Sequence, residues 1–253
     1  MSFTESRLEL IRGLLRQHQR VDVKDLVDRL KVSHESIRRD LRELETQGFA
    51  RRVYGGAVID HQESDQPFSV RLRLGAREKA RIGEAAAALV KDGMKIFLDE
   101  GTTVLACLKH IEARKDVTVV TNSLAVATHF YYQATTNVRI LGGRLRPVYQ
   151  ATFGPEAVAA IKEHFFDLAI IAISAVHVER GFMDYGEDEA ILRRAAREQA
   201  KRSVIVADST KFGRLGSIHT FGLDAVHGVI TGGEIAKEYL DKFQKLKVDV
   251  IHA

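Results

Sequence analysis

The feature that most constrains the fold is an alternation of β-like and helical runs from Glu78 to the end of the chain. Apolar runs such as KIFLD, VTVVT, LAIIAIS and SVIVAD are typical of buried strands, and segments between them, such as PEAVAAIKEHF, repeat apolar residues at helical spacing. Strands that alternate with helices form largely parallel sheets whose two faces are both covered. The sequence therefore predicts an α/β domain over residues 76–253.

The region before this domain shows three helical patterns in succession. Apolar residues recur at helical spacing over residues 5–18, and Asp22 is placed to cap a second helix. A third helix is expected from Ser33, its N-cap, to Gly48, its C-cap.

A short hairpin is expected directly after the third helix. FARRVYGGAVI contains two β-like runs around YGG, with Arg51 and Arg52 near the tip. Three helices followed by such a hairpin predict a winged helix-turn-helix domain over residues 1–59, whose third helix enters the major groove of DNA. The polar segment DHQESDQP then begins a linker over residues 60–75.

The third helix carries its arginines on the face opposite its apolar stripe. The stripe runs from Ile37 to Leu44, and at about 100° per residue Arg38, Arg39 and Arg42 point away from it. This domain holds 12 Lys and Arg against 9 Asp and Glu, so its charge alone decides little, and a charged helix face is usually only solvated. The helix order and the basic hairpin favour DNA contact, because guanidinium groups suit both phosphates and guanine edges.

Four loops of the α/β domain are expected at the carboxyl ends of strands, where open α/β sheets bind ligands. They are DEGTT, TNS, GGR and ADSTKFG, and their backbone N–H groups, hydroxyls and lysine suit a phosphate. The residues predicted to bind it are Asp99, Gly101, Thr102, Thr103, Thr121, Asn122, Ser123, Gly142, Gly143 and Lys211.

No catalytic residue, metal or cofactor is predicted. The chain lacks G-x-G-x-x-G, P-loop and G-x-S-x-G motifs, and its histidines do not show ligand spacing. A catalytic carboxylate is weighed against the common use of acids at helix starts, where they suit the helix dipole, and the second interpretation is preferred. The acids concerned are Asp99, Glu100, Asp184, Glu187, Asp188 and Glu189.

The sequence also bears on location and redox chemistry. No apolar run is long enough to span a membrane, and the N-terminus lacks the order of a signal peptide, so we expect a cytoplasmic protein. Cys107 lies on the apolar side of a predicted helix and is expected to be a packed thiol, not a reactive one.

The motif VSHESIRRDLRELETQGFARRVYGGA resembles the N-terminal signature of the DeoR family of bacterial sugar-catabolism repressors. DEGTT, TNS, LGG and ADSTKFG stand in the order of that family's effector domain, which is similar to sugar-phosphate isomerases. The resemblance spans essentially the whole chain and implies a winged helix-turn-helix followed by a Rossmann-like α/β effector domain. Taken with the outward arginines, it implies DNA contacts by Ser33, His34, Glu35, Ser36, Arg38, Arg39, Arg42, Arg51, Arg52 and Tyr54.

The sequence departs from the family pattern at a few positions. Ser36 replaces the usual Thr and Tyr54 the usual His. Ala172 and Ala175 stand where Gly is more frequent, and His177 stands near a usual Asp, so the resemblance does not name the effector.

The resemblance implies a repressor of a carbohydrate-catabolism operon. Such a protein forms a dimer or tetramer, binds double-stranded operator DNA, and leaves it when a phosphorylated sugar or polyol binds. Two alternatives stay open at this point: an enzyme that converts a sugar phosphate and carries a DNA-binding module, and a transcriptional activator.

Overall fold

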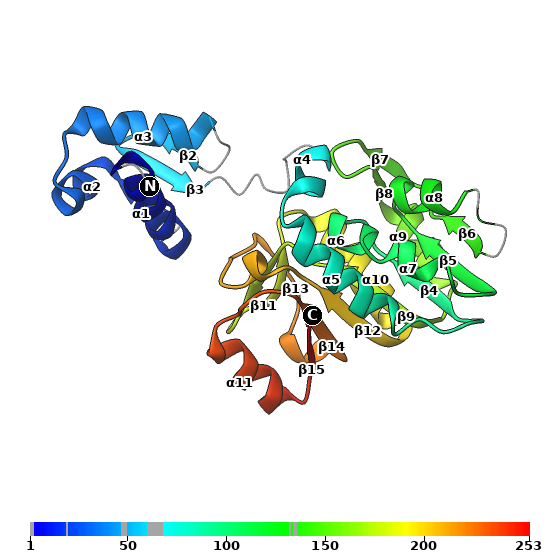
Figure 1. Ribbon diagram of the computed structural model, residues 1–253. Coiled ribbons are helices and arrows are strands. Elements are labelled where there is room, and N and C mark those ends of the chain that lie inside the picture. The colour runs from blue at the N-terminus through cyan, green and yellow to red at the C-terminus, as the bar shows by residue number, and fades with distance from the viewer. Residues whose placement is uncertain (1–2, 19, 47–49, 60–67, 132, 134–135) are drawn as a thin grey trace. The chain divides into compact units, whose positions relative to one another are not determined.

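The computed structural model describes residues 3–18, 20–46, 50–59, 68–131, 133 and 136–253. Its contacts divide the chain into an N-terminal unit, Met1–Gln66, and a C-terminal unit, Pro67–Ala253 (Figure 1). Residues 60–67 of the predicted linker lie outside the described residues, and the rest of that segment contains the first helix of the C-terminal unit. The domain bounds given above therefore stay predictions.

The N-terminal unit has three helices and a three-stranded antiparallel sheet in the order β1-β3-β2. Its elements are α1 (Phe3–His18), β1 (Arg20–Asp22), α2 (Val23–Leu30), α3 (His34–Thr46), β2 (Ala50–Val53) and β3 (Gly56–Ile59). The predicted three helices and hairpin are confirmed. The sequence did not indicate β1, because three residues are too short to show a strand pattern.

The apolar stripe predicted for α3 forms the core of this unit. Ile37, Leu41 and Leu44 are buried, and they pack in one cluster with Ile11 and Leu15 of α1. The amphipathic pattern of α3 therefore fixes which of its faces is left for solvent.

The two predicted helix caps differ. Ser33 accepts a hydrogen bond from the backbone N–H of Ser36 at 3.2 Å, which confirms it as the N-cap of α3. Asp22 precedes α2 but makes no cap hydrogen bond, and its carboxylate accepts from Arg20 instead. The predicted C-cap, Gly48, lies outside the described residues.

A buried ion pair joins α1 to α3. The Nε and Nη2 atoms of Arg7 donate to the two carboxylate oxygens of Asp40 at 2.6 and 2.9 Å. The side chain of Asp40 is 2% exposed and that of Arg7 is 11% exposed, so solvent screens the pair little.

The C-terminal unit is built on a seven-stranded parallel sheet in the order β15-β14-β12-β9-β4-β5-β6. The helices are α4 (Phe68–Arg73), α5 (Ala76–Ala87), α6 (Thr102–Leu105), α7 (Leu108–Ile111), α8 (Leu124–Phe130), α9 (Pro155–Lys162), α10 (Glu187–Glu198), α11 (Lys237–Leu246) and the 3-10 turns η1 (Ser209–Lys211) and η2 (Leu223–Ala225). The sheet strands are β4 (Lys95–Leu98), β5 (Val117–Thr121), β6 (Thr136–Ile140), β9 (Phe166–Ala172), β12 (Ala200–Val206), β14 (Gly228–Thr231) and β15 (Asp249–His252). The predicted α/β class is confirmed.

The strand order reverses between β4 and β9. From β4 the chain adds β5 and β6 on one side, and it then returns to add β9, β12, β14 and β15 on the other. The loops that leave β4 and β9 at this switch point diverge, and a crevice for ligands is expected outside their carboxyl ends.

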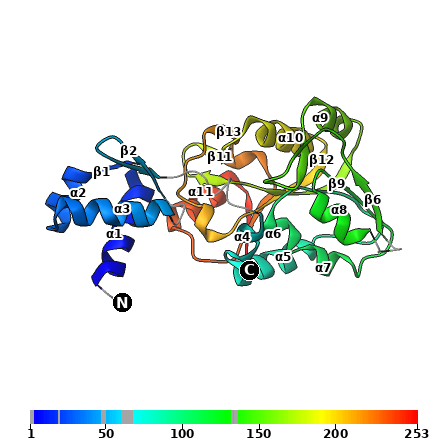
Figure 2. The same ribbon diagram turned by 90° about the horizontal axis from the view of Figure 1, so that it is seen from above.

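Helices cover both faces of this sheet. Figure 2 shows α9 and α10 on one side and α5, α6 and α7 on the other. Phe153 and Phe243 belong to the apolar cluster of the first side, and Ile82 and Phe130 to that of the second. Among the described helices, none has the length and apolar character needed to cross a membrane.

Cys107 lies in the second apolar cluster. Its Sγ–H points to the carbonyl oxygen of Thr103 at 3.8 Å, and burial raises the pKa of the thiol to about 12. The predicted packed thiol is confirmed by this burial, and the raised pKa favours its protonated form.

Two small antiparallel groups of strands were not predicted. One has the order β10-β11-β13, formed by Ala175–His177, Gly181–Asp184 and Ile218–Phe221. The other pairs β7 (Arg144–Arg146) with β8 (Ala151–Phe153). Strands of three or four residues are too short for a period-2 pattern to stand out.

We predict that Arg7→Ala destabilises the N-terminal unit by about 3 kcal/mol, because it leaves Asp40 as a buried charge without its partner. Protection of the α3 amides against hydrogen exchange should then fall roughly a hundredfold. Arg12→Ala is the control, since Arg12 pairs with the exposed Glu9 and such pairs contribute little. Equal protection in the two variants would contradict the importance of the Arg7–Asp40 pair.

Candidate functional site

The outward face of α3 presents two arginines to solvent. Arg38 and Arg39 are exposed, and neither forms a hydrogen bond or ion pair with any residue that the structure describes. Arg42 is also exposed, but its Nη2 donates to the carboxylate of Glu35 at 2.8 Å. A nucleic acid would have to compete with Glu35 for Arg42, whereas Arg38 and Arg39 need give up no such contact.

The other residues predicted at the start of α3 lie beside these arginines. Ser33, His34 and Glu35 are exposed, and Ser36 is half-buried. The hydroxyls of Ser33 and Ser36 lie 3.0 Å apart, so both belong to the capping turn that begins the helix.

The hairpin presents a tyrosine at its tip. Tyr54 is fully exposed, and the next residue, Gly55, has a φ of +81°, which a glycine adopts without strain. Arg52 lies in β2 before the tip, where its backbone N–H and Nε donate to Glu45 at 3.0 and 2.6 Å and lower the pKa of that carboxyl. The side chain of Arg51 lies outside the described part of the hairpin.

The predicted phosphate residues of the C-terminal unit lie at the carboxyl ends of β4, β5, β6 and β12. After β5, Thr121 and Ser123 use their hydroxyls within the loop, accepting from the backbone N–H groups of Ser123 and Val126. Asn122 is fully buried, and its Nδ2 donates to the carbonyl oxygen of Thr152 at 3.2 Å. Because a carbonyl only accepts, the amide is fixed with its Oδ1 on the other side.

A buried ammonium that the sequence did not indicate lies against the loop after β4. Lys79 of α5 donates from Nζ to the Thr102 hydroxyl at 2.9 Å and to the carbonyl oxygen of Arg71 at 2.8 Å. Gly101 has a φ of +138°, and a Cβ there would lie 2.8 Å from the Cβ of Ala172. Since α6 is only four residues long, the positive charge at this loop comes mainly from Lys79.

The remaining predicted residues lie at the ends of β6 and β12. Gly142 and Gly143 are exposed, and a Cβ on Gly143 would lie 2.5 Å from the carbonyl oxygen of Phe153. Lys211 is half-buried in η1, in a loop whose Ser209 donates to the Glu78 carboxylate from both its N–H and its hydroxyl. These contacts hold the Lys211 loop against α5, the helix that also carries Lys79.

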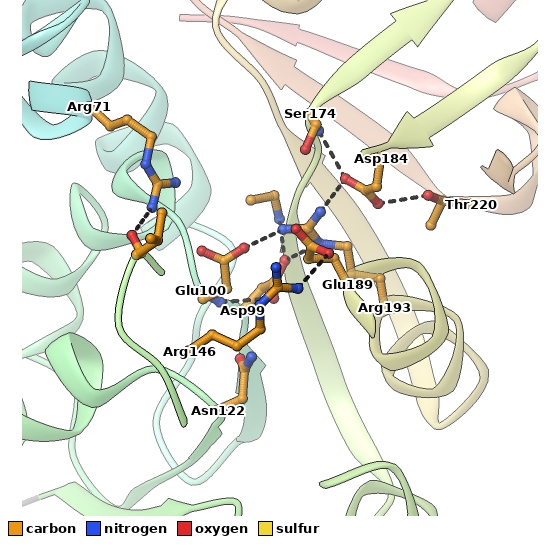
Figure 3. A network of polar contacts seen from close by, with 12 residues as sticks. Arg71, Asp99, Glu100, Asn122, Arg146, Ser174, Asp184, Glu189, Arg193 and Thr220 are labelled. Atoms are coloured by element: carbon orange, nitrogen blue, oxygen red, sulfur yellow. Dashed lines mark hydrogen bonds and ion pairs between the residues drawn. The ribbon is translucent and has the colours of Figure 1, made fainter. Parts of the chain in front are cut away.

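At the switch point, three carboxylates surround one buried guanidinium (Figure 3). Arg193 of α10 donates from Nε to Asp99 at 2.7 Å, from Nη2 to Glu100 at 2.7 Å, and from Nη1 to Asp184. Asp99 also accepts from the backbone N–H of Ala172, at the end of β9. One side chain thus joins the ends of β4 and β11 to α10.

The charges of this cluster do not balance. Asp99, Glu100, Asp184 and Glu189 are buried, against the single buried guanidinium of Arg193. Burial raises the pKa of Asp99, and it raises the pKa of Glu100 to about 7 although Arg193 opposes the shift. Burial therefore favours the protonated form of Glu100 more than it would be favoured in an exposed carboxyl.

Two further guanidinium groups border the acidic cluster. Arg71 and Arg146 both lie over the ring of Tyr149, at 5.3 and 5.0 Å from its centroid. Arg71 also donates to the carbonyl oxygen of Val148 at 2.9 Å, and Arg146 reaches toward Glu189, with 3.7 Å between Nη1 and Oε2 (Figure 3). Stacking on Tyr149 holds both cations at the side of the cluster.

The helix-dipole explanation is wrong for Asp99, Glu100 and Asp184, because these carboxylates bind Arg193. Glu187 is exposed in the first turn of α10, and neighbouring Asp188 pairs with Arg144 at 2.8 Å. Within the described ranges, no group of three or more His, Cys, Asp and Glu side chains is arranged to hold a metal ion.

Sequence reasoning missed four basic residues of this site: Arg71, Lys79, Arg146 and Arg193. A signal existed for Arg193, since it stands four residues after Glu189 on the side of α10 that buries Ala196. An arginine on the buried side of a helix usually has a charged partner, but the helical spacing does not show that the partners here are Asp99, Glu100 and Asp184.

Comparisons with known proteins place both units. The model of a DeoR-like helix-turn-helix domain matches residues 7–63, and that of a DeoR C terminal sensor domain matches residues 75–233. The HTH-type transcriptional repressor GlcR of Bacillus subtilis (strain 168) is 31% identical over 98% of this chain and 96% of its own. A putative aga operon transcriptional repressor of Escherichia coli O157:H7 is 33% identical over 98% and 93%. Among solved structures, ribose 5-phosphate isomerase A of Methanocaldococcus jannaschii is 17% identical over 55% of each chain, with a TM-score of 0.41.

We predict that Glu100→Gln changes how the stability of the C-terminal unit depends on pH. Between the ordinary pKa of 4.5 and the folded value of about 7, the folded state binds a proton that the unfolded state releases. The free energy of unfolding of the wild type therefore falls as pH rises through this window, and Gln removes that fall. The stability of the variant relative to wild type should rise by about 2 kcal/mol from pH 5 to pH 8 in urea denaturation. If the free energies of unfolding of the wild type and of Glu100→Gln change with pH in parallel, the raised pKa of Glu100 is contradicted.

Proposed function

The chain belongs to the DeoR family of transcriptional repressors, and from this premise we propose that it represses a carbohydrate-catabolism operon and is released by a phosphorylated sugar or polyol. The N-terminal unit binds double-stranded operator DNA in this proposal, and the C-terminal unit binds the effector. The observation that carries it is the pair Arg38 and Arg39, which are exposed on the third helix of a helix-turn-helix and have no partner among the described residues.

The wing and the start of α3 complete the proposed DNA surface. Base edges are proposed to be read by the N-terminal half of α3, from Ser33 to Arg39, and backbone contacts to come from Arg42, Arg51, Arg52 and Tyr54. Arg42 and Arg52 already bind carboxylates of α3, so their contribution to affinity is expected to be smaller than that of Arg38 and Arg39.

The proposed phosphate site is the set of loops at the carboxyl ends of β4, β5, β6 and β12. The buried Lys79 ammonium on the Thr102 hydroxyl supports an anion there, because a phosphate can accept charge-assisted hydrogen bonds from both. A matching family model that is described as a sensor domain supports a small-molecule ligand in this unit.

The contacts of Lys79 suggest how the ligand acts on the rest of the chain. Its Nζ also binds the carbonyl oxygen of Arg71 in α4, the first helix after residues 60–67. A phosphate that takes hydrogen bonds from Lys79 competes with this contact, so α4 is the element whose position the ligand can change. The ligand then favours a conformation that binds DNA less well.

We propose regulation without catalytic turnover, with no metal or cofactor. Glu100, whose pKa lies near 7, is the residue that the enzyme alternative would use as a base, but it is already bound to Arg193. The proposed assembly is a homo-oligomer, dimer or tetramer, which presents the arginines to paired half-sites, and the proposed location is the cytoplasm.

We predict that Arg38→Ala and Arg39→Ala each remove about 1 to 3 kcal/mol of specific DNA affinity, because each loses a guanidinium contact to phosphate or base. The measurement is a gel-shift titration at fixed salt, with an operator selected from random duplexes by the wild-type protein. Arg12→Ala in α1 serves as the control. A double variant that binds the selected operator like wild type would show that α3 is not the recognition helix.

We predict that Lys79→Met gives a protein that binds operator normally but resists release by sugar phosphates. The loss of a charge-assisted hydrogen bond lowers the affinity for the effector on the order of tenfold to a hundredfold. Release is measured by fluorescence anisotropy of labelled operator, and the melting temperature without ligand checks that the variant is folded. Lys211→Ala is expected to act in the same direction, and Lys109→Met, at an exposed lysine of α7, is the control. If Lys79→Met leaves the operator at the same effector concentration as the wild type does, the proposed phosphate site is contradicted.

A further inference from the structure

Three buried oxygen atoms at the switch point have no hydrogen-bond partner among the described residues. They are Oε2 of Glu100, Oδ1 of Asn122, and Oε2 of Glu189, which has only the ion-pair contact with Nη1 of Arg146 at 3.7 Å. None of these residues is more than 2% exposed, so water does not reach them freely. A buried acceptor without a donor is costly, and three at one place indicate that a ligand supplies the donors.

Two of these side chains, Glu100 and Asn122, are held with their oxygens in fixed positions. Arg193 binds Oε1 of Glu100, and the carbonyl of Thr152 binds Nδ2 of Asn122, so rotation that would satisfy the unpaired oxygen breaks an existing bond. Glu100 and Glu189 both lie in the cluster that Figure 3 shows. Asn122 follows Thr121, which pairs with Leu98 of β4, so its loop is next to the loop that begins at Asp99. Because these side chains are already fixed, binding a ligand here costs little conformational entropy.

The surrounding charges select the kind of donor. An ammonium group would meet the guanidinium groups of Arg193, Arg146 and Arg71, which all lie at this cluster. A hydroxyl is neutral, donates one hydrogen bond and accepts others. It can therefore bind a carboxylate oxygen and also accept from Nε of Arg71, a buried donor that has no partner within the described part of the chain.

The cluster also lies next to the proposed anion loop, since Glu100 directly precedes Gly101 and Thr102. The geometry points to a polyol subsite, in which Glu100, Glu189 and Asn122 accept hydrogen bonds from neighbouring hydroxyl groups of the effector while its phosphate lies at Thr102 and Lys79. This inference rests on the proposed function, because it assigns the part of the effector that this cluster binds. It predicts that the number and position of hydroxyl groups decide which phosphate ester releases the repressor.

The test is isothermal titration calorimetry of the full chain with probes of graded hydroxyl content. Methyl phosphate carries no hydroxyl on carbon, glycerol 3-phosphate carries two, and hexose 6-phosphates carry more; a 2-deoxyhexose 6-phosphate removes one. We expect the best hexose phosphate to bind at least about tenfold tighter than methyl phosphate, a gain that one charge-assisted hydrogen bond can give. The ratio of the affinity for the best hexose phosphate to the affinity for methyl phosphate should fall about tenfold in Glu100→Gln and in Glu189→Gln. The affinity for methyl phosphate itself should stay unchanged.

Glu187→Gln, at an exposed position in the first turn of α10, is the matched control and should keep the wild-type ratio. If the wild type binds methyl phosphate and hexose phosphates equally well, the polyol subsite is overturned and the proposed function still stands. The same holds if both Gln variants keep the affinity ratio of the wild type. If an unphosphorylated hexitol binds and Glu100→Gln weakens it, the subsite is supported and the phosphate assignment fails. Binding of none of these probes overturns both proposals.

Discussion

The buried guanidinium of Arg193 holds together the C-terminal unit at the carboxyl end of its parallel sheet. It is the buried cation at a place where β4, β11 and α10 each bring a carboxylate out of water. Without it, Asp99, Glu100 and Asp184 would be buried charges that repel one another. The parallel sheet provides the switch point, and Arg193 is the donor that Asp99, Glu100 and Asp184 share there, although Asp99 and Asp184 also accept from other groups.

Such a cluster is a poor way to stabilise a fold. Apolar residues of similar volume often stabilise a protein as much as a buried ion pair does or more, because desolvation offsets most of the Coulombic gain. Here several carboxylates lie around one buried guanidinium, and Glu100 and Glu189 each keep one oxygen without a hydrogen bond from the part of the chain that the structure describes. Excess acceptors at a switch point are better explained by a ligand than by stability. The N-terminal unit shows the converse, since Arg7 binds Asp40 for structure while Arg38 and Arg39 have no such partner within the described residues.

Much of the fold was predictable because it rests on periodic patterns. The third helix followed from Ile37, Leu41 and Leu44, and the parallel sheet followed from its apolar runs. The loops at strand ends could be located, but their partners could not, because Lys79, Arg146 and Arg193 reach the site from distant segments. Sequence spacing contains no information on contacts between residues 94 positions apart, such as Asp99 and Arg193.

In the proposed mechanism, an effector at the switch point and operator DNA on α3 bind to different conformations of one protein. Thermodynamic linkage then requires the effect to be reciprocal. The most direct test measures the affinity of the releasing sugar phosphate with and without saturating operator. We predict that bound operator lowers the affinity for the sugar phosphate by a certain factor. The sugar phosphate should lower the affinity for operator by the same factor. An affinity for the sugar phosphate that is the same on DNA-bound and free protein would contradict the coupling.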